Sequence, residues 1–250
     1  MTIGIVLVAV TAFIYWNGLF SQNTCNVANI SLQGGVFPHL TEEDATQDLV
    51  SSKDIREALI SARDDSSIEA VLISADSSGG STVAGQEVAA AIKEVGKPVA
   101  VIVGDMALSA GYLAISPADV IFAYEQSEIG SIGITMSYLE NVEKNKKDGL
   151  SFIELASGKF KEIGNPDKPL LWEERQLLQK QADGYHDLLV DDIAENRNLP
   201  PERIRSLADG KFFSGVEAKK LGLIDEVGTY FDVLRWIENK IGHKAIICQL

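Results

Sequence analysis

The chain has 250 residues, of which 46% are hydrophobic and 23% charged, so it is long enough to bury a full core and is globular rather than disordered. Its formal net charge of −14 argues against nucleic acid and anionic membrane surfaces as partners, because both are bound by basic surfaces. The two cysteines, Cys25 and Cys248, lie at opposite ends of the chain. Their spacing suggests neither a metal site nor a disulfide framework, and nothing points to a cofactor.

Residues 2–20 carry no charged side chain and have about the length that a bilayer-spanning helix needs. The segment lacks a clear cleavage site and ends in aromatic residues, which favours an uncleaved anchor over a removed secretory signal. We therefore expect residues 1–21 to form a transmembrane anchor and residues 22–250 to form the main domain. The first charges after the segment are acidic, which fits a single-pass membrane protein whose main domain lies on the extracytoplasmic side.

Past this segment the chain alternates strand and helix patterns, which predicts an α/β domain. The expected strands are 27–32, 68–75, 98–103, 120–123, 151–155 and 245–248. The expected helices are 51–63, 83–95, 170–196 and 231–240. Apolar residues on more than one side of the long helix 170–196 favour a homo-oligomer over a monomer.

Ser109 lies where the buried-strand pattern 98–103 gives way to small residues typical of a helix. At the first turn of a helix, backbone N–H groups are unpaired and the helix dipole is positive, which suits an alkoxide or an oxyanion. The alternative interpretation is an ordinary N-cap serine.

The pair Gly79-Gly80 follows the strand 68–75 and precedes a helix. Glycines at this place let the backbone turn sharply and present N–H groups to a phosphate or an oxyanion. The lysine of a phosphate-binding loop is absent at the required spacing. A plain tight turn is the alternative.

A serine nucleophile needs a base, and the three histidines are poor candidates. His39 follows the first strand in a loop, His186 lies inside the long helix, and His243 is near the C-terminus. The segment 157–163 offers Lys159 and Lys161 instead, and a lysine can serve as base when its surroundings favour the neutral amine. A solvated surface charge is the alternative for each lysine.

Together these stretches resemble the S49 family of serine peptidases, of the signal peptide peptidase A type. The family's motifs are similar here to 76–80, 109–112, 130–133, 157–162 and 215–228, and the resemblance covers roughly residues 27 to 240. Two departures are small. Ser78 stands where the family usually has proline, and Ala110 stands where it has glycine after the nucleophile.

The resemblance implies Ser109 as nucleophile and Lys161, which directly precedes an acidic residue, as general base in place of Lys159. It implies that Ser131 orients the lysine. The backbone N–H groups of Gly80 and Ala110 would form the oxyanion hole.

The resemblance also implies a ClpP/crotonase-type fold of stacked ββα units, which commonly assemble into rings where neighbouring subunits can complete a site. The expected function is a membrane-anchored serine endopeptidase with a Ser/Lys dyad, degrading cleaved signal peptides or other hydrophobic peptides. Alternatives are a relative that cuts hydrophobic tails of membrane-associated proteins, a crotonase-fold acyl-CoA enzyme, and a catalytically silent scaffold.

Overall fold

The computed structural model describes residues 25–41, 44 and 47–250. The predicted anchor at residues 2–20 lies outside this part of the chain. Within the part described, no helix combines the length and the apolar character needed to cross a membrane. The chain divides into two compact units. We call them the sheet unit, which comprises the described residues up to Ile129 together with Phe213–Leu250, and the insert unit, Gly130–Phe212.

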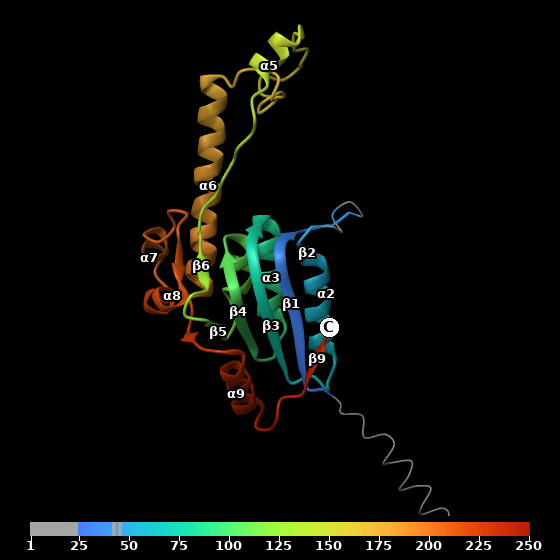
Figure 1. Cartoon of the computed structure of the whole chain (residues 1–250), viewed down its shortest axis with the longest axis vertical. Coiled ribbons are helices and arrows are strands. Elements are labelled where there is room, and N and C mark those ends of the chain that lie inside the picture. The colour runs from blue at the N-terminus through green and yellow to red at the C-terminus, as the bar shows by residue number, and fades with distance from the viewer. Residues whose placement is uncertain (1–24, 42–43, 45–46) are drawn as a thin grey trace, which may run out of the picture. The chain divides into compact units, whose positions relative to one another are not determined.

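The sheet unit is built on parallel strands in the order β2-β1-β3-β4-β5-β8, and β9 pairs with β1 as well (Figure 1). The strands are β1 (Val27–Phe37), β2 (Leu49–Ser51), β3 (Ala70–Gly80), β4 (Val99–Leu108), β5 (Val120–Ala123), β8 (Glu226–Val227) and β9 (Ile247–Gln249). The central strands read as continuous apolar runs because a parallel sheet is covered on both faces. The expected α/β class and strands 27–32, 68–75, 98–103, 120–123 and 245–248 are confirmed.

Successive side chains of a strand point to opposite faces of the sheet, and the helices cover both faces. On one face, alternate residues of β1, β3, β4 and β5 form a core cluster with Val233 and Ile237 of α9 (Tyr230–Ile241). Three helices, α2 (Ser52–Asp64), α3 (Thr82–Glu94) and α4 (Ala110–Ile115), pack against β1, β3 and β4. The short α8 (Gly215–Leu221) precedes β8.

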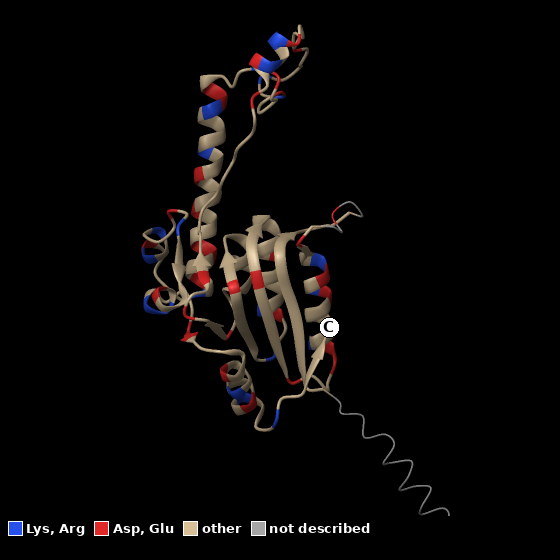
Figure 2. Ribbon diagram, in the orientation of Figure 1, with Lys and Arg blue, Asp and Glu red and all other residues tan. Residues whose placement is uncertain are grey.

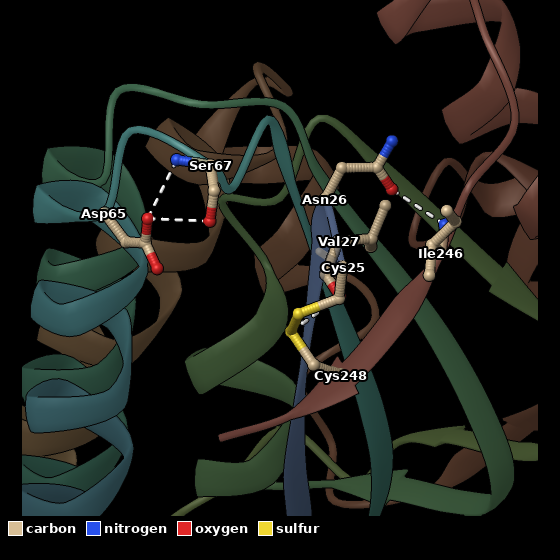
Figure 3. Close-up of a disulfide and its surroundings, with 7 residues drawn as sticks. All are labelled: Cys25, Asn26, Val27, Asp65, Ser67, Ile246 and Cys248. Atoms are coloured by element: carbon tan, nitrogen blue, oxygen red, sulfur yellow. Dashed lines mark hydrogen bonds between the residues drawn. A yellow bond between two sulfur atoms is a disulfide. The ribbon is translucent and has the colours of Figure 1, made fainter. Parts of the chain in front are cut away.

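A disulfide joins Cys25 to Cys248, which corrects the expectation that the cysteines have no such role (Figure 3). Their Cα atoms lie 5.5 Å apart because β9 pairs in parallel beside the start of β1, although 223 positions separate them in sequence. The side chain of Asn26 continues this junction by accepting a hydrogen bond from the Ile246 N–H. Sequence spacing alone gave no sign of the bond, since only the sheet brings the two ends together.

The insert unit contains α5 (Val142–Lys147), α6 (Trp172–Asn196) and α7 (Pro201–Arg205). The strands β6 (Glu128–Gly130) and β7 (Phe212–Ser214), which pair with each other, lie across its two sequence boundaries with the sheet unit. The long helix α6 confirms the expected helix 170–196, and a proline begins α7. The strand expected at 151–155 is wrong. These residues form no helix or strand and are exposed, so their alternating pattern has no neighbouring strand to pair with.

Candidate active site

Ser109 forms a sharp turn between β4 and α4. Its backbone angles are φ 50° and ψ −122°, values that resemble the first central residue of a type II′ turn, a position dominated by glycine. A side chain held in such a conformation costs about 1–3 kcal/mol. The hydroxyl makes no capping hydrogen bond to α4, so the interpretation of Ser109 as an ordinary N-cap serine is wrong.

Gly79 lies directly beside Ser109. Its φ is +115°, and a methyl group added to it would meet the Cβ of Ser109 at 3.0 Å and the hydroxyl oxygen at 3.6 Å. Gly80 has a φ of +140°, and an added methyl group would lie 2.2 Å from the Val36 carbonyl oxygen on β1. The glycine pair is therefore required for close approach of β3 to both neighbours.

The role of the Gly80 and Ala110 N–H groups as oxyanion donors stays a prediction, and the backbone around them indicates where each N–H group points. Ala110 is the first residue of α4, where the N–H group has no acceptor within the helix. The N–H of Ser81 donates to the Val36 carbonyl on β1, and successive N–H groups of a strand alternate in direction. The N–H of Gly80 is thus expected to point away from β1, toward the side of β3 on which β4 and Ser109 lie.

Buried hydrogen bonds support the turn at Ser109. The Ser77 side chain is fully buried, donates to the Gly34 carbonyl and accepts from the Gly79 N–H. A side chain at Gly111 would lie 2.5 Å from the Ser77 hydroxyl, so only glycine fits there. The hydroxyl of Tyr112, also fully buried, donates to the Leu223 carbonyl at 2.7 Å.

The late motif 215–228 supports the sheet unit. Its Asp225 carboxylate accepts a hydrogen bond from the Ile121 N–H at 2.8 Å, which ties the segment before β8 to β5. Gly222 ends α8 in the left-handed conformation. The Leu223 carbonyl of this motif accepts the hydrogen bond from Tyr112 of α4, so the motif also holds the helix that follows Ser109.

Ser131 belongs to the insert unit. Its backbone has a φ of 49°, its N–H donates to the Lys211 carbonyl, and its hydroxyl donates to the Gly210 carbonyl at 3.1 Å. The structure thus gives the Ser131 hydroxyl a partner other than a lysine. Its pairing with Lys161 stays a prediction.

Both candidate lysines also belong to the insert unit, in the exposed turns that precede α6. The ammonium of Lys159 forms an ion pair with Glu173 and lies 5.2 Å from the centre of the Phe160 ring. Lys161 is exposed, and its backbone N–H donates to the Gly158 carbonyl. Lys161 lies in the insert unit and Ser109 in the sheet unit, and their pairing stays a prediction.

One residue of the site was not singled out from sequence. Asp76 of β3 accepts hydrogen bonds from the Asp105 and Met106 N–H groups of β4, just before the turn at Ser109. The available signal was an acidic residue directly after the apolar strand pattern 68–75. Among the described residues, no three His, Cys, Asp or Glu side chains are grouped so as to hold a metal ion.

Known proteins similar to this chain include several proteases. A protein of Methanocaldococcus jannaschii, provisionally named as a protease, is 38% identical over 176 residues, which cover 70% of this chain and 57% of the relative. Protease 4 of Haemophilus influenzae is 28% identical over 227 residues, covering 87% of this chain and 35% of the relative. The chloroplastic serine protease SPPA of Arabidopsis thaliana is 30% identical over 182 residues, covering 72% and 27%. The chain therefore spans only part of the length of these relatives.

The fold has a solved counterpart. A mutant ClpP1 from Listeria monocytogenes superposes with a TM-score of 0.54 at 17% identity, covering 84% of this chain and 94% of that one. This likeness confirms the expected ClpP-type fold. The model of peptidase family S49 matches residues 91–244, more than half of the chain, and this span includes the turn at Ser109, both candidate lysines and the late motif. The chain therefore belongs to peptidase family S49.

Proposed function

We propose that the protein is a serine endopeptidase in which Ser109 attacks the peptide carbonyl and Lys161 acts as general base. The observation that carries this proposal is the strained turn of Ser109, whose hydroxyl is not used for capping and whose Cβ leaves no room for a side chain at Gly79. Strained backbone at a strand-to-helix turn is typical of an exposed nucleophile. Membership of the S49 family supports the same chemistry.

In the proposed reaction Lys161 first accepts a proton and then donates it. The neutral amine of Lys161 takes the Ser109 proton as the oxygen bonds to the carbonyl carbon, and the Gly80 and Ala110 N–H groups stabilise the resulting oxyanion. The lysine then gives its proton to the leaving amine. Water then attacks the carbonyl carbon of the acyl-enzyme while the lysine accepts its proton. The ester bond to Ser109 breaks as the lysine returns that proton to the serine oxygen, which frees the enzyme and the acid product. Ser131 is proposed to orient the amine.

Lys161 is the better base because Lys159 has another partner. The Lys159 ammonium forms an ion pair with the Glu173 carboxylate, a contact that Lys159 would have to give up to act as the base. Lys161 directly precedes Glu162, as the family pattern requires of the base.

Hydrophobic peptides are the proposed substrates. The insert unit contains a cavity of about 840 Å³. The first residue that lines it, Ile134, follows Ser131 closely in sequence, and its other lining residues include Met136, Tyr138, Leu170 and Leu178. Cleaved signal peptides, or the hydrophobic tails of membrane-associated proteins, have the matching chemistry.

A homo-oligomeric ring is proposed as the working form. The insert unit exposes large apolar side chains that one copy of the chain leaves uncovered, with Leu155 96% and Trp172 74% exposed. Such surfaces on soluble domains mark interaction sites. A neighbouring copy would cover them and complete the catalytic site.

The proposed location is the extracytoplasmic side of a membrane, with residues 1–21 as the anchor. The disulfide between Cys25 and Cys248 supports this side, because disulfides persist in oxidising compartments. The anchored form should stay in the membrane pellet after a carbonate wash, and recovery from cells of a mature chain that begins after Phe20 would contradict it.

The test is labelling of the full-length protein with a fluorophosphonate probe, followed by hydrolysis of a hydrophobic peptide library. Labelling and hydrolysis should be lost in Ser109→Ala and retained in Ser116→Ala, a serine at the other end of α4 whose hydroxyl donates to Leu113. Lys161→Ala and Lys161→Arg should both be inactive, since a guanidinium does not release its proton. Loss of activity in Lys159→Ala with full activity in Lys161→Ala would reverse the base assignment. Absence of labelling and of hydrolysis in the unmodified protein would favour a silent scaffold.

A further inference from the structure

Asp76 and Asp105 are the only charged residues in β3 and β4. Figure 2 shows the two strands as tan ribbons with red acidic segments. A carboxylate within a sheet is costly unless its oxygens accept hydrogen bonds. The partners of Asp76 therefore indicate what it does.

The two strands change register at Asp76. Ala75 lies opposite Val103, and the next paired residues are Ser77 and Ala107. One residue of β3 thus faces the three residues 104–106 of β4, so that β4 carries two extra residues at this point. Such a bulge leaves backbone N–H groups outside the regular ladder.

The carboxylate of Asp76 accepts hydrogen bonds from N–H groups within the bulge. Its Oδ2 accepts from Asp105 at 3.3 Å, and its Oδ1 accepts from Met106 at 3.1 Å. The carboxylate also lies against Gly104, where an added methyl group would meet Oδ2 at 3.0 Å. On the other side, the Ser127 hydroxyl donates to the Gly104 carbonyl at 2.5 Å.

The register change decides which residue of β4 meets the glycine pair. A shift of two residues keeps every side chain on its own face of the sheet, because side chains alternate with a period of two. With the bulge, Ser109 lies beside Gly79, since a methyl group added to Gly79 would meet the Ser109 Cβ at 3.0 Å. In the register of residues 71–75, Ala107 would take that place and Ser109 would lie beyond the end of β3.

We propose that Asp76 is a positioning residue, whose carboxylate holds the two extra residues of β4 so that Ser109 is placed beside Gly79. The part of this inference that concerns catalysis rests on the proposed function. Asp76 acts through its hydrogen bonds to the backbone N–H groups of Asp105 and Met106.

The experiment measures backbone protection and nucleophile reactivity in the same full-length protein in detergent. In Asp76→Ala, amide hydrogen exchange should rise in residues 104–109 and stay unchanged in residues 99–103. The rate of fluorophosphonate labelling should fall about 100-fold, as expected for a small misplacement of a reacting group. Asp76→Asn should recover part of the rate, because an amide oxygen can still accept from Met106.

Asp119→Ala is the matched control, since its carboxylate accepts from the Val99 N–H at 2.8 Å at the opposite end of β4. It should lower thermal stability without slowing labelling of the folded protein. Unchanged exchange at 104–109 in Asp76→Ala would overturn the proposal, as would equal labelling rates for Asp76→Ala and Asp119→Ala. If exchange changes as expected but the unmodified protein is never labelled, the proposed function fails while the role of Asp76 in setting the register stands.

Discussion

Replacing Ser109 by glycine should make the protein more stable than replacing it by alanine, although both variants lack the reactive hydroxyl. At φ 50° and ψ −122° a residue with a Cβ is strained by about 1–3 kcal/mol, and glycine is not. Glycine loses about 0.5–1 kcal/mol more conformational entropy on folding than alanine does. Subtracting the entropy loss from the strain, we expect the unfolding free energy of Ser109→Gly to exceed that of Ser109→Ala by about 1 kcal/mol.

Thermal unfolding of the two variants measures this difference. For a chain of this size, about 1 kcal/mol corresponds to roughly 2–4 °C in midpoint. Ser116 supplies the control, because it follows the same helix with ordinary helical angles of φ −57° and ψ −27°. There the order should reverse, with Ser116→Gly less stable than Ser116→Ala by about 0.5–1 kcal/mol.

The reasoning is refuted if glycine is the less stable replacement at both positions. That result would mean that the turn relaxes at no cost when the hydroxyl is removed, so that no strain is stored at Ser109. Confirmation would show that the fold gives up stability at Ser109, the proposed nucleophile.

Four further predictions concern packing, assembly, the disulfide and pH. Gly79→Ala should slow labelling of Ser109, because the added methyl group would lie 3.0 Å from the Ser109 Cβ. Gly96→Ala is the control: Gly96 also has a positive φ, but no atom lies within 4 Å of its added methyl group, so this variant should only lower stability. Equal labelling rates for the two variants would contradict the role of the contact. Light scattering should find a ring-sized assembly, and a fully active monomer would refute it. Reduction of the disulfide should lower the unfolding free energy by up to about 5 kcal/mol, because the bond closes a loop of more than 200 residues, and an unchanged midpoint in reductant would count against it. The hydrogen bonds from Lys168 and from the Leu171 N–H hold the pKa of Glu174 below its ordinary value of 4.5. The stability that the ionised Glu174 adds to the folded state is therefore present above pH 4.5 and is lost as pH falls through the lowered pKa. Glu174→Gln should lower the unfolding free energy at pH 7 and make it depend less on pH in the acid range.

Local patterns in the sequence were sufficient for most elements of the sheet unit. The apolar runs of β3 and β4 identify buried parallel strands, because only a sheet covered on both faces buries every residue of a strand. The same reasoning failed at 151–155, where an alternating pattern lies in exposed chain, since alternation does not show whether a partner strand exists.

The motifs identified the family and named Ser109, because a serine after a buried strand and a glycine pair after another are local features. Three things required the tertiary structure. The bond between Cys25 and Cys248 depends on the pairing of β9 with β1. The strain at Ser109 depends on a backbone conformation that residue types do not encode. The role of Asp76 depends on a register shift between strands, which is a relation between two segments and is therefore absent from either one alone.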